Sequence, residues 1–328
     1  MSIPVIDIAP FLDGSDPDGV ARAVAKACED IGFLTIVGHG VAPEIIEQMR
    51  AVSRAFFDQD MAAKERVRRA NLDHARGYFR YGEVALAKSL GVQTPPDLKE
   101  VFSMGPPTAP VALSGDDVAL HFGANLWPDA MPELRVAFTA YFGALALLAS
   151  QMMELFAMAL GVERHFFADK IDHAPSSLAA VNYPEQAVAP LPGQTRAGAH
   201  SDYGTLTILL SENRPGGLLV RDRAGAWVDV VTRPDSFVVN IGDLMMQWTN
   251  DRWISTVHRV VNPPPDALGS RRQSIVFFHN ANHDAVVECI PTCRGPGAPL
   301  HATVLAGEHR LAKFRRANRL PVVERVEA

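Results

Sequence analysis

A histidine and an aspartate two positions apart, His200 and Asp202, are the feature that most constrains this chain. In a β-strand, residues i and i+2 point to the same side, so both side chains can reach one ion. Of the 11 histidines, only His200 has an aspartate two positions later. Residues 205–210 are β-branched and apolar and predict a strand. The pair therefore predicts a metal-binding position where a sheet opens onto a cavity.

A third ligand, His258, is available in a second strand-like segment, residues 254–261. Because His258 lies far beyond Asp202 in sequence, the chain must return to bring them together, as it does in a double-layered antiparallel sheet. Two imidazoles and one carboxylate leave three positions open on an iron(II) ion, which suits a metal that binds both a co-substrate and O2. A core or edge histidine is the alternative for His258 taken alone.

Arg272 and Ser274 alternate onto one face of a third strand-like run, residues 272–278. A guanidinium matches a carboxylate with two hydrogen bonds, and a hydroxyl adds one more donor. An inward-pointing arginine needs an anion, because an unpaired buried charge is costly. A surface arginine at the start of a strand is the alternative, and this is what we expect of Arg271.

The five residues His200, Asp202, His258, Arg272 and Ser274 match a family motif one for one. Through these five residues the chain resembles the isopenicillin N synthase-like branch of the iron(II)/2-oxoglutarate-dependent dioxygenases. Similar segments occur through most of the chain, at residues 3–8, 32–41, 76–78, 97–100, 125–128 and 240–243.

The resemblance implies a mixed α and β fold, in which flanking helices surround a double-stranded β-helix of the jelly-roll, cupin-like type. It implies iron(II), 2-oxoglutarate as co-substrate and O2, with the metal held by His200, Asp202 and His258.

The same resemblance assigns the far carboxylate of 2-oxoglutarate to Arg272 and Ser274. Tyr183, in a Tyr-Pro pair that the family often carries, would also contact the co-substrate. Val181 stands where the family often has an asparagine.

The implied activity is that of a non-haem iron dioxygenase that oxidises an unactivated C–H bond of a small organic molecule, most often by hydroxylation, and releases succinate and CO2. Two alternatives stay open at this level. One is a family oxidase, cyclase or desaturase that acts without 2-oxoglutarate. The other is a non-catalytic module that binds a metal or ligand.

We expect one compact domain over residues 1–328. A mixed α/β region with binding loops should occupy residues 1–125, a long helix or broken pair of helices 131–161, the jelly-roll catalytic core 176–295 and a C-terminal helix 303–317. Short β-rich runs separated by turn residues predict the jelly roll. The basic residues of the last helix, Arg310 among them, are expected to face solvent.

Substrate-binding residues are expected around the mouth of the site. The candidates are Tyr78, Glu83, Phe102, Met104 and Phe278. The aromatic and thioether side chains suit an apolar wall. Glu83 would recognise a cationic or hydrogen-bond-donating group, unless it is a solvated loop carboxylate.

Composition sets the remaining expectations. A net charge of −6 and a pI near 6.0 give no electrostatic case for binding nucleic acid or an anionic membrane. The N-terminus lacks the basic and apolar pattern of a secretory signal. Three cysteines do not suggest a disulfide framework. We therefore expect a cytoplasmic monomer whose partner is a small-molecule substrate.

Overall fold

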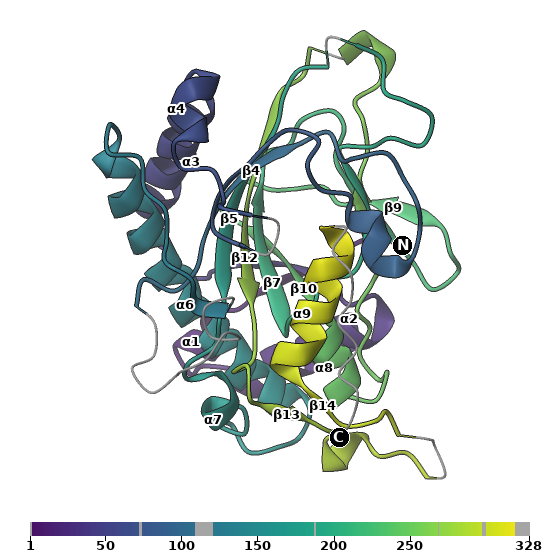
Figure 1. The fold of residues 1–328 in the computed structure, drawn as a ribbon. Coiled ribbons are helices and arrows are strands. Elements are labelled where there is room, and N and C mark those ends of the chain that lie inside the picture. Colours follow the sequence, from purple (N-terminus) through teal and green to yellow (C-terminus); the bar gives the residue numbers. More distant parts are fainter. Residues whose placement is uncertain are drawn as a thin grey trace, which may run out of the picture.

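The computed structural model describes residues 2–71, 74–108, 121–186, 188–267, 269–296 and 300–318. Its strands form two stacked sheets, with helices on the outer face of the larger one (Figure 1). The larger sheet has eight strands, in the spatial order β1 (Val5–Asp7), β2 (Phe33–Val37), β10 (Phe237–Ile241), β7 (Leu206–Ser211), β12 (Arg272–His279), β5 (Ser177–Tyr183), β4 (Glu100–Met104) and β3 (Gly77–Phe79).

The smaller sheet has four antiparallel strands, in the order β6 (Ala197–His200), β11 (His258–Val260), β8 (Leu218–Arg221) and β9 (Trp227–Asp229). Buried side chains of both sheets, such as Val181 and Val238 from the larger and Val220 and Val260 from the smaller, form one apolar cluster. Two antiparallel sheets that share a core in this way make a jelly roll, and the fold class expected from the resemblance is confirmed.

Alternation along the strands separates two kinds of surface. In β12, Val276 and Phe278 contact the cluster between the sheets, whereas Ile275 and Phe277 belong to the cluster under the helices. Arg272, two positions before Ser274, is on the same inner face as Val276, because the side-chain period of a strand is two. The inner face therefore carries the polar side chains, and the outer face carries the main core.

The helices are α1 (Ala9–Leu12), α2 (Pro17–Asp30), α3 (Pro43–Phe57), α4 (Met61–Glu65), α6 (Pro132–Ala159), α7 (Ala168–Ile171), α8 (Asp243–Trp248) and α9 (Ala306–Ala317), with 3-10 turns η1 (Leu86–Leu90), η2 (Pro265–Ala267) and η3 (Pro291–Cys293). Proline in the first turn of α2, α3 and α6 fits a position that needs no amide donor. Asp16 caps α2, where its carboxylate accepts a hydrogen bond from the Gly19 amide.

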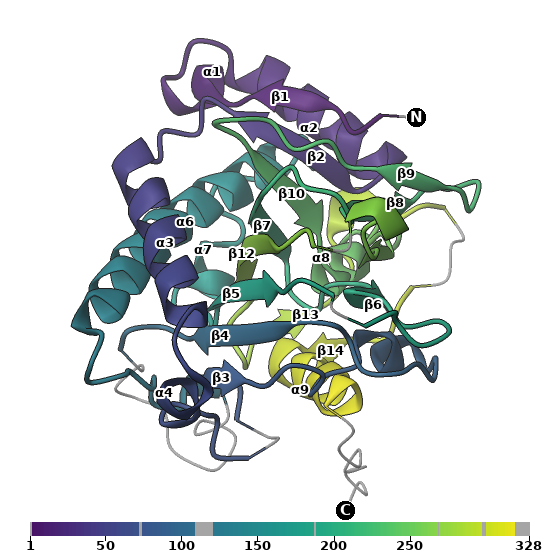
Figure 2. The same ribbon diagram turned by 90° about the horizontal axis from the view of Figure 1, so that it is seen from above.

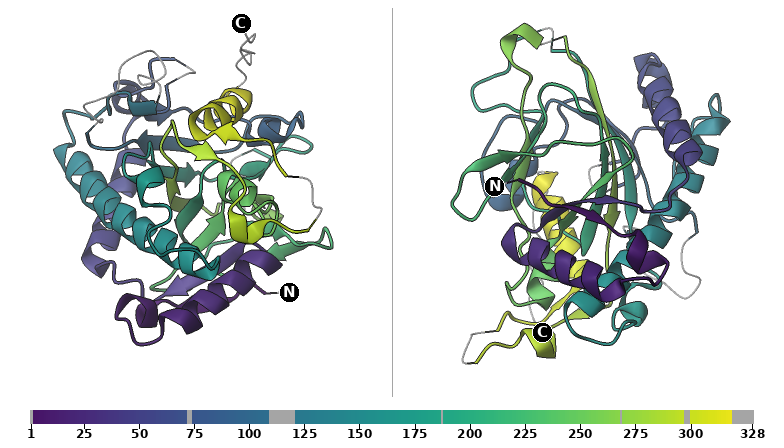
Figure 3. Two further views of the ribbon diagram at one scale, coloured as in Figure 1. Left: turned by 90° about the horizontal axis from the view of Figure 1, so that it is seen from below. Right: turned by 180° about the vertical axis from the view of Figure 1, so that it is seen from behind.

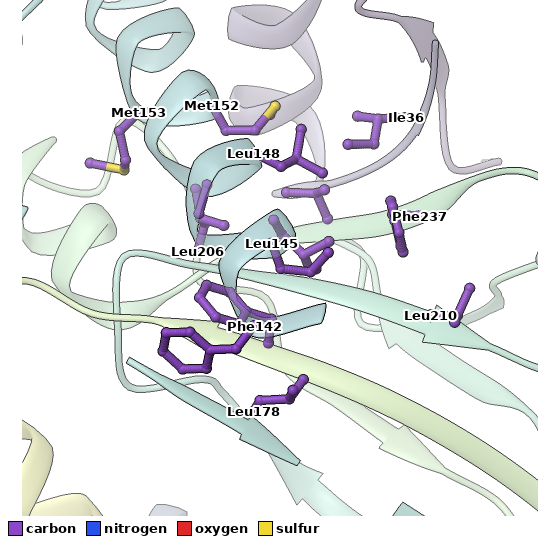
Figure 4. Packing of buried hydrophobic residues seen from close by; sticks show 14 of the residues in the cluster. Ile36, Phe142, Leu145, Leu148, Met152, Met153, Leu178, Leu206, Leu210 and Phe237 are labelled. Carbon is purple, nitrogen blue, oxygen red and sulfur yellow. The ribbon is translucent and has the colours of Figure 1, made fainter. Parts of the chain in front are cut away.

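The apolar segment expected at 131–161 forms one continuous helix, α6. By length and apolar composition alone α6 would suffice to cross a membrane. Its buried side chains, however, pack against the larger sheet: Phe142, Leu145 and Leu148 lie among Leu178, Leu206 and Phe237 of the strands (Figure 4). Figure 2 shows α3 beside α6 on this side of the sheet. The helix is thus part of the main core.

The larger sheet is not confined to residues 176–295, where the jelly roll was expected. Strands β1 to β4 come from residues before 105 and flank the later strands on both sides (Figure 2). β1 and β2 pair in parallel and extend the sheet beyond β10, and α2 packs beneath them (Figure 3). The region 1–125, expected to be mixed α/β with binding loops, also contributes β3 and β4 next to β5.

The C-terminal helix α9 packs beside η1 and next to the small antiparallel pair β13 (Val286–Val287) and β14 (Val304–Leu305), as Figure 1 shows in yellow. Lys313 of α9 places its Nζ 2.9 Å from Oδ2 of the buried Asp243, the first residue of α8. The expectation that the basic residues of this helix face solvent is wrong for Arg310, which is 8% exposed.

Candidate metal centre and co-substrate site

Three potential metal ligands converge at the edge of the smaller sheet. His200 ends β6, Asp202 follows it in the turn, and His258 begins β11, directly opposite His200 in the antiparallel pair. The Nε2 atoms of His200 and His258 lie 3.9 and 3.8 Å from Oδ1 of Asp202. All three side chains are buried, and their ligand atoms lie within 4.8 Å of one another. One ion can therefore contact all three.

Backbone carbonyls orient both rings. Nδ1 of His200 is 2.7 Å from the Gly198 carbonyl, and Nδ1 of His258 is 3.0 Å from the Thr256 carbonyl. A carbonyl only accepts, so Nδ1 carries the proton and the Nε2 lone pair is free for a metal. Burial, and next the charge of His258, lower the pKa of His200 to about 3, which keeps its ring in the neutral form that binds a metal.

Hydrogen bonds to one of its two oxygens orient the carboxylate of Asp202. Its Oδ2 accepts hydrogen bonds from Thr207 Oγ1 at 2.6 Å and Asn240 Nδ2 at 2.7 Å. Oδ1 is left toward the two imidazoles, as a monodentate ligand requires. Thr207 and Asn240 were not predicted. Strand alternation places Thr207 on the inner face of β7, but Asn240 comes from a distant strand and its contact follows from tertiary pairing.

Arg272 and Ser274 form the end of a small cavity of about 80 Å³ that begins at the three potential ligands. Arg272 is 2% exposed and donates from Nη1 to Ser274 Oγ at 3.1 Å, from Nη2 to Ser211 Oγ and from Nε to the Glu212 carbonyl at 3.3 Å. Among the residues that the structure describes, no carboxylate forms an ion pair with it. A buried guanidinium of this kind can bind an anion that enters the cavity.

Tyr183 lines the same cavity, and the Arg272 guanidinium carbon lies 5.6 Å from its ring centre. Arg271 points the other way, as expected: its Nε donates to Asn182 at 2.8 Å, and it pairs with Asp58 near the surface. Ser211, the second hydroxyl on Arg272, was missed because its strand, β7, pairs with β12 only in the folded sheet.

A second cavity, of about 190 Å³, also reaches two of the potential ligands, His200 and Asp202. His200, Asp202 and Phe278 line both cavities. Most of the remaining wall is apolar, and it includes Phe79, Val84, Leu86, Val101, Val181 and Phe314. The structure places Phe278, one of the expected substrate-binding residues, on a wall that the two cavities share.

Three other substrate candidates do not reach this cavity. Tyr78, Phe102 and Met104 are buried in the cluster beneath α3 and α6. Strand pairing joins Tyr78 to Phe102 on that outer face, and joins their neighbours Phe79 and Val101 on the inner face, toward the cavity. The predicted substrate-facing residues are thus displaced by one position in each strand, and a displacement of one position moves a side chain to the other face of the sheet.

Glu83 does not line the cavity either. Its carboxylate lies 3.3 Å from Arg68 and 3.2 Å from Arg69, and it accepts a hydrogen bond from the Arg80 amide at 2.8 Å. The side chain is 11% exposed. Glu83 therefore connects two basic residues, and neither of the roles considered from the sequence describes it.

Two family models match the chain. The N-terminal model of non-haem dioxygenases in morphine synthesis matches residues 3–130, and the model of the 2OG-Fe(II) oxygenase superfamily matches residues 175–281. The second range contains the three potential metal ligands together with Arg272 and Ser274.

Relatives match over nearly the whole chain. A validamycin A dioxygenase of Streptomyces hygroscopicus subsp. limoneus is 34% identical over 95% of this chain and 86% of its own length. A homoarginine-6-hydroxylase of Oryza sativa subsp. japonica is 31% identical over 95% of this chain and 96% of its own. The solved structure of a full-length Neurospora crassa protein in complex with alpha-KG and thymine superimposes with a TM-score of 0.82, at 28% identity, over 95% of this chain and 96% of that one.

The donor set fits the metal and co-substrate of these relatives. Two imidazoles and one carboxylate suit iron(II) and leave room on it, and a buried arginine with two hydroxyls suits a dicarboxylate. The chain belongs to the 2OG-Fe(II) oxygenase superfamily, as a non-haem iron dioxygenase that uses iron(II), 2-oxoglutarate and O2.

Proposed function

We propose that this dioxygenase hydroxylates a C–H bond of a small organic molecule, with iron(II) held by His200, Asp202 and His258. The balance is one substrate, one O2 and one 2-oxoglutarate giving one hydroxylated product, one succinate and one CO2. Iron(II), when bound, supplies the redox chemistry that couples this decarboxylation to oxidation of the substrate.

The observation that carries the proposal is that two cavities meet at the ligands: His200 and Asp202 line both, and His258 lines the smaller. The smaller cavity ends at Arg272 and is polar there, whereas the larger is mostly apolar. A co-substrate and a substrate can thus approach one metal from different sides. The relatives support a small substrate, since one is named as a hydroxylase of homoarginine and the Neurospora crassa protein holds thymine.

The side chains would divide the work as follows. Arg272 binds the far carboxylate of 2-oxoglutarate in a fork, with Ser274 and Ser211 as further donors, and Tyr183 covers it. Phe278 separates the co-substrate from the substrate and positions both. The buried walls keep bulk water from the reacting groups.

The test is turnover of a metabolite library by the iron-loaded protein with 2-oxoglutarate, with succinate and product measured together under 18O2. Hydroxylation predicts substrate-stimulated succinate in equal amount to a product that gains one oxygen atom from O2. His258→Ala should lose both signals, and Arg271→Leu, on the opposite face of β12, should keep both.

Other outcomes would contradict hydroxylation. A product that loses two hydrogens and gains no oxygen would indicate desaturation or ring closure. A product formed without succinate would indicate an oxidase, with Arg272 bound to the substrate itself. Binding of iron and 2-oxoglutarate without any turnover would indicate a non-catalytic module.

A further inference from the structure

The larger cavity has an arginine at the end formed by α9. Arg310 is 8% exposed and lines the cavity together with Phe314, Ala317 and Asn318 of the same helical segment. Figure 1 shows α9 lying across the strands of the core. A helix that closes a mostly apolar cavity would be expected to present apolar side chains, so a buried guanidinium there requires an explanation.

Arg310 has no acidic partner. Its Nη2 is at hydrogen-bond distance from Nδ1 of His121, its Nε has no hydrogen-bond partner, and no carboxylate of the described residues pairs with it. Arg76 lies in the same cluster, 1% exposed, and donates to the Ala75 carbonyl at 3.2 Å and the His121 carbonyl at 2.9 Å. Two buried positive charges therefore meet only neutral acceptors.

The electrostatics of the cluster agree with its geometry. Burial lowers the pKa of Arg310 to about 10, and burial followed by the charge of Arg310 lowers the pKa of Arg76 to about 9. Burial, and then the charge of Arg310, lower the pKa of His121 to about 3, so the ring is neutral and its Nδ1 accepts from Arg310. Both arginines remain cations at neutral pH, and no acidic side chain in the part of the chain that the structure describes pairs with them.

The other cationic side chain that lines this cavity, that of Lys99, has an acidic partner. Lys99, near His200, has its Nζ 3.3 Å from Oδ2 of the buried Asp97. The charge of Lys99 is thus offset inside the protein, whereas that of Arg310 is not. The only described carboxylate that lines this cavity is Asp202, which faces the two imidazoles.

We propose that the substrate is a small, mostly apolar molecule with a carboxylate, and that Arg310 binds this carboxylate. The inference rests on the proposed function, because it concerns the substrate of that same site. A carboxylate supplies the missing counter-ion and takes two hydrogen bonds from a guanidinium, one of them from the unpartnered Nε. The rest of the molecule would lie against Phe79, Val101 and Phe278, toward His200 and Asp202.

The test uses four apolar acids, hexanoate, benzoate, cyclohexaneacetate and 3-phenylpropionate, each with its primary amide and its amine counterpart. Dissociation constants are measured by calorimetry without oxygen, on protein saturated with iron(II) and 2-oxoglutarate. At least one acid should bind about ten- to a hundredfold more tightly than its amide, and the amine should be weakest. If no acid binds more tightly than its amide, the inference is overturned.

Variants locate the anion. Arg310→Met should remove the preference for the acid and leave amide binding unchanged. Arg310→Lys should retain part of the preference for the acid. Arg316→Met, on the exposed side of α9, should retain all of this preference. A preference that survives Arg310→Met would place the anion elsewhere and overturn the assignment. Ligand-free Arg310→Met should also melt no lower than the wild type, because a charge without a counter-ion does not stabilise the fold.

The 2-oxoglutarate used in the same samples separates the two proposals. If 2-oxoglutarate binds in these samples but the acids show no preference over their amides, the carboxylate inference alone fails. If 2-oxoglutarate does not bind, the proposed function fails with it. An acid that 2-oxoglutarate displaces is bound at Arg272, and that result also counts against Arg310.

Discussion

His258 lies directly opposite His200 in the antiparallel pair of β11 and β6, and the centres of the two imidazole rings are 4.3 Å apart. The separation of these ligands is therefore set by the register of two hydrogen-bonded strands. Each ring is then fixed by a carbonyl of its own segment. The positions of both imidazoles are thus set by strand pairing and by backbone carbonyls.

Replacing either histidine should remove the metal. His200→Ala or His258→Ala leaves two ligands, which hold iron(II) poorly, so iron content after anaerobic loading and gel filtration should fall to near background. His165→Ala, at an exposed histidine that belongs to no cluster of potential metal ligands among the described residues, is the control. Full iron content in either ligand variant would exclude that histidine.

The hydrogen bonds that orient the Asp202 carboxylate should contribute to iron affinity almost as much as the ligand itself. Asn240→Ala removes the 2.7 Å hydrogen bond to Oδ2, so the carboxylate is less well oriented and iron affinity should fall about ten- to a hundredfold. Competition with a chelator measures this change. An iron affinity equal to that of the wild type would show that Thr207 alone orients Asp202.

Arg272→Leu should raise the dissociation constant for 2-oxoglutarate about ten- to a hundredfold, because a charged hydrogen bond contributes roughly 1.5–3 kcal/mol. Iron affinity should change little. Arg271→Leu is the control, since Arg271 bonds Asn182 and Asp58 on the other face. Equal effects in the two variants would refute the assignment of faces.

Phe278→Ala should affect substrate selectivity, whereas Met104→Ala should affect stability. Phe278 lines both cavities, so its loss should change substrate selectivity and leave more succinate released without product. Met104 is 1% exposed in the outer core, and its truncation should lower the free energy of unfolding by about 2–5 kcal/mol with selectivity unchanged. Urea denaturation and product ratios distinguish these results; altered selectivity in Met104→Ala would contradict them.

The ion pair of Lys313 and Asp243 should hold α9 in place. Burial alone would raise the pKa of the Asp243 carboxyl, but His309, Lys313 and Ser255 hold it below its ordinary value. Lys313→Met should lower stability by roughly 1–3 kcal/mol at pH 7, less than for a fully buried pair. It should also speed hydrogen exchange in α9.

The pH dependence follows from the lowered pKa. Stability from this carboxylate is complete above its ordinary pKa and is lost as the pH falls through the lower value of the folded state. The difference between wild type and Lys313→Met should therefore shrink below about pH 4. A difference that grows on acidification would show that the pair is not what stabilises α9.

Residue type and spacing were sufficient for the parts of the site that lie on single strands. Arg272 and Ser274 alternate along β12 as predicted. His200 and Asp202 reach the same cavity as this pair, although Asp202 lies in the turn after β6 and not on the strand. The strand predicted at 205–210 is also present, as β7.

The faces of β3 and β4 could not be predicted in the same way. Phe102 and Val101 are both apolar, and both faces of this sheet are covered, so hydrophobicity does not distinguish inside from outside. Asn240 and Ser211 reach the site through pairing between strands far apart in sequence. Arg310 was assigned to solvent because a basic helix usually is exposed, and only the packing of α9 shows otherwise.

The strand order of the larger sheet limits how this protein can be divided. A fragment of residues 175–281 would keep β5, β12, β7 and β10 but lose β4 on one side and β2 on the other. Both ends of the remaining sheet would become open edges, whose free amides and carbonyls pair readily with other chains. The segment that holds every proposed iron and 2-oxoglutarate residue would thus tend to aggregate when expressed alone, because early strands protect the margins of the catalytic sheet.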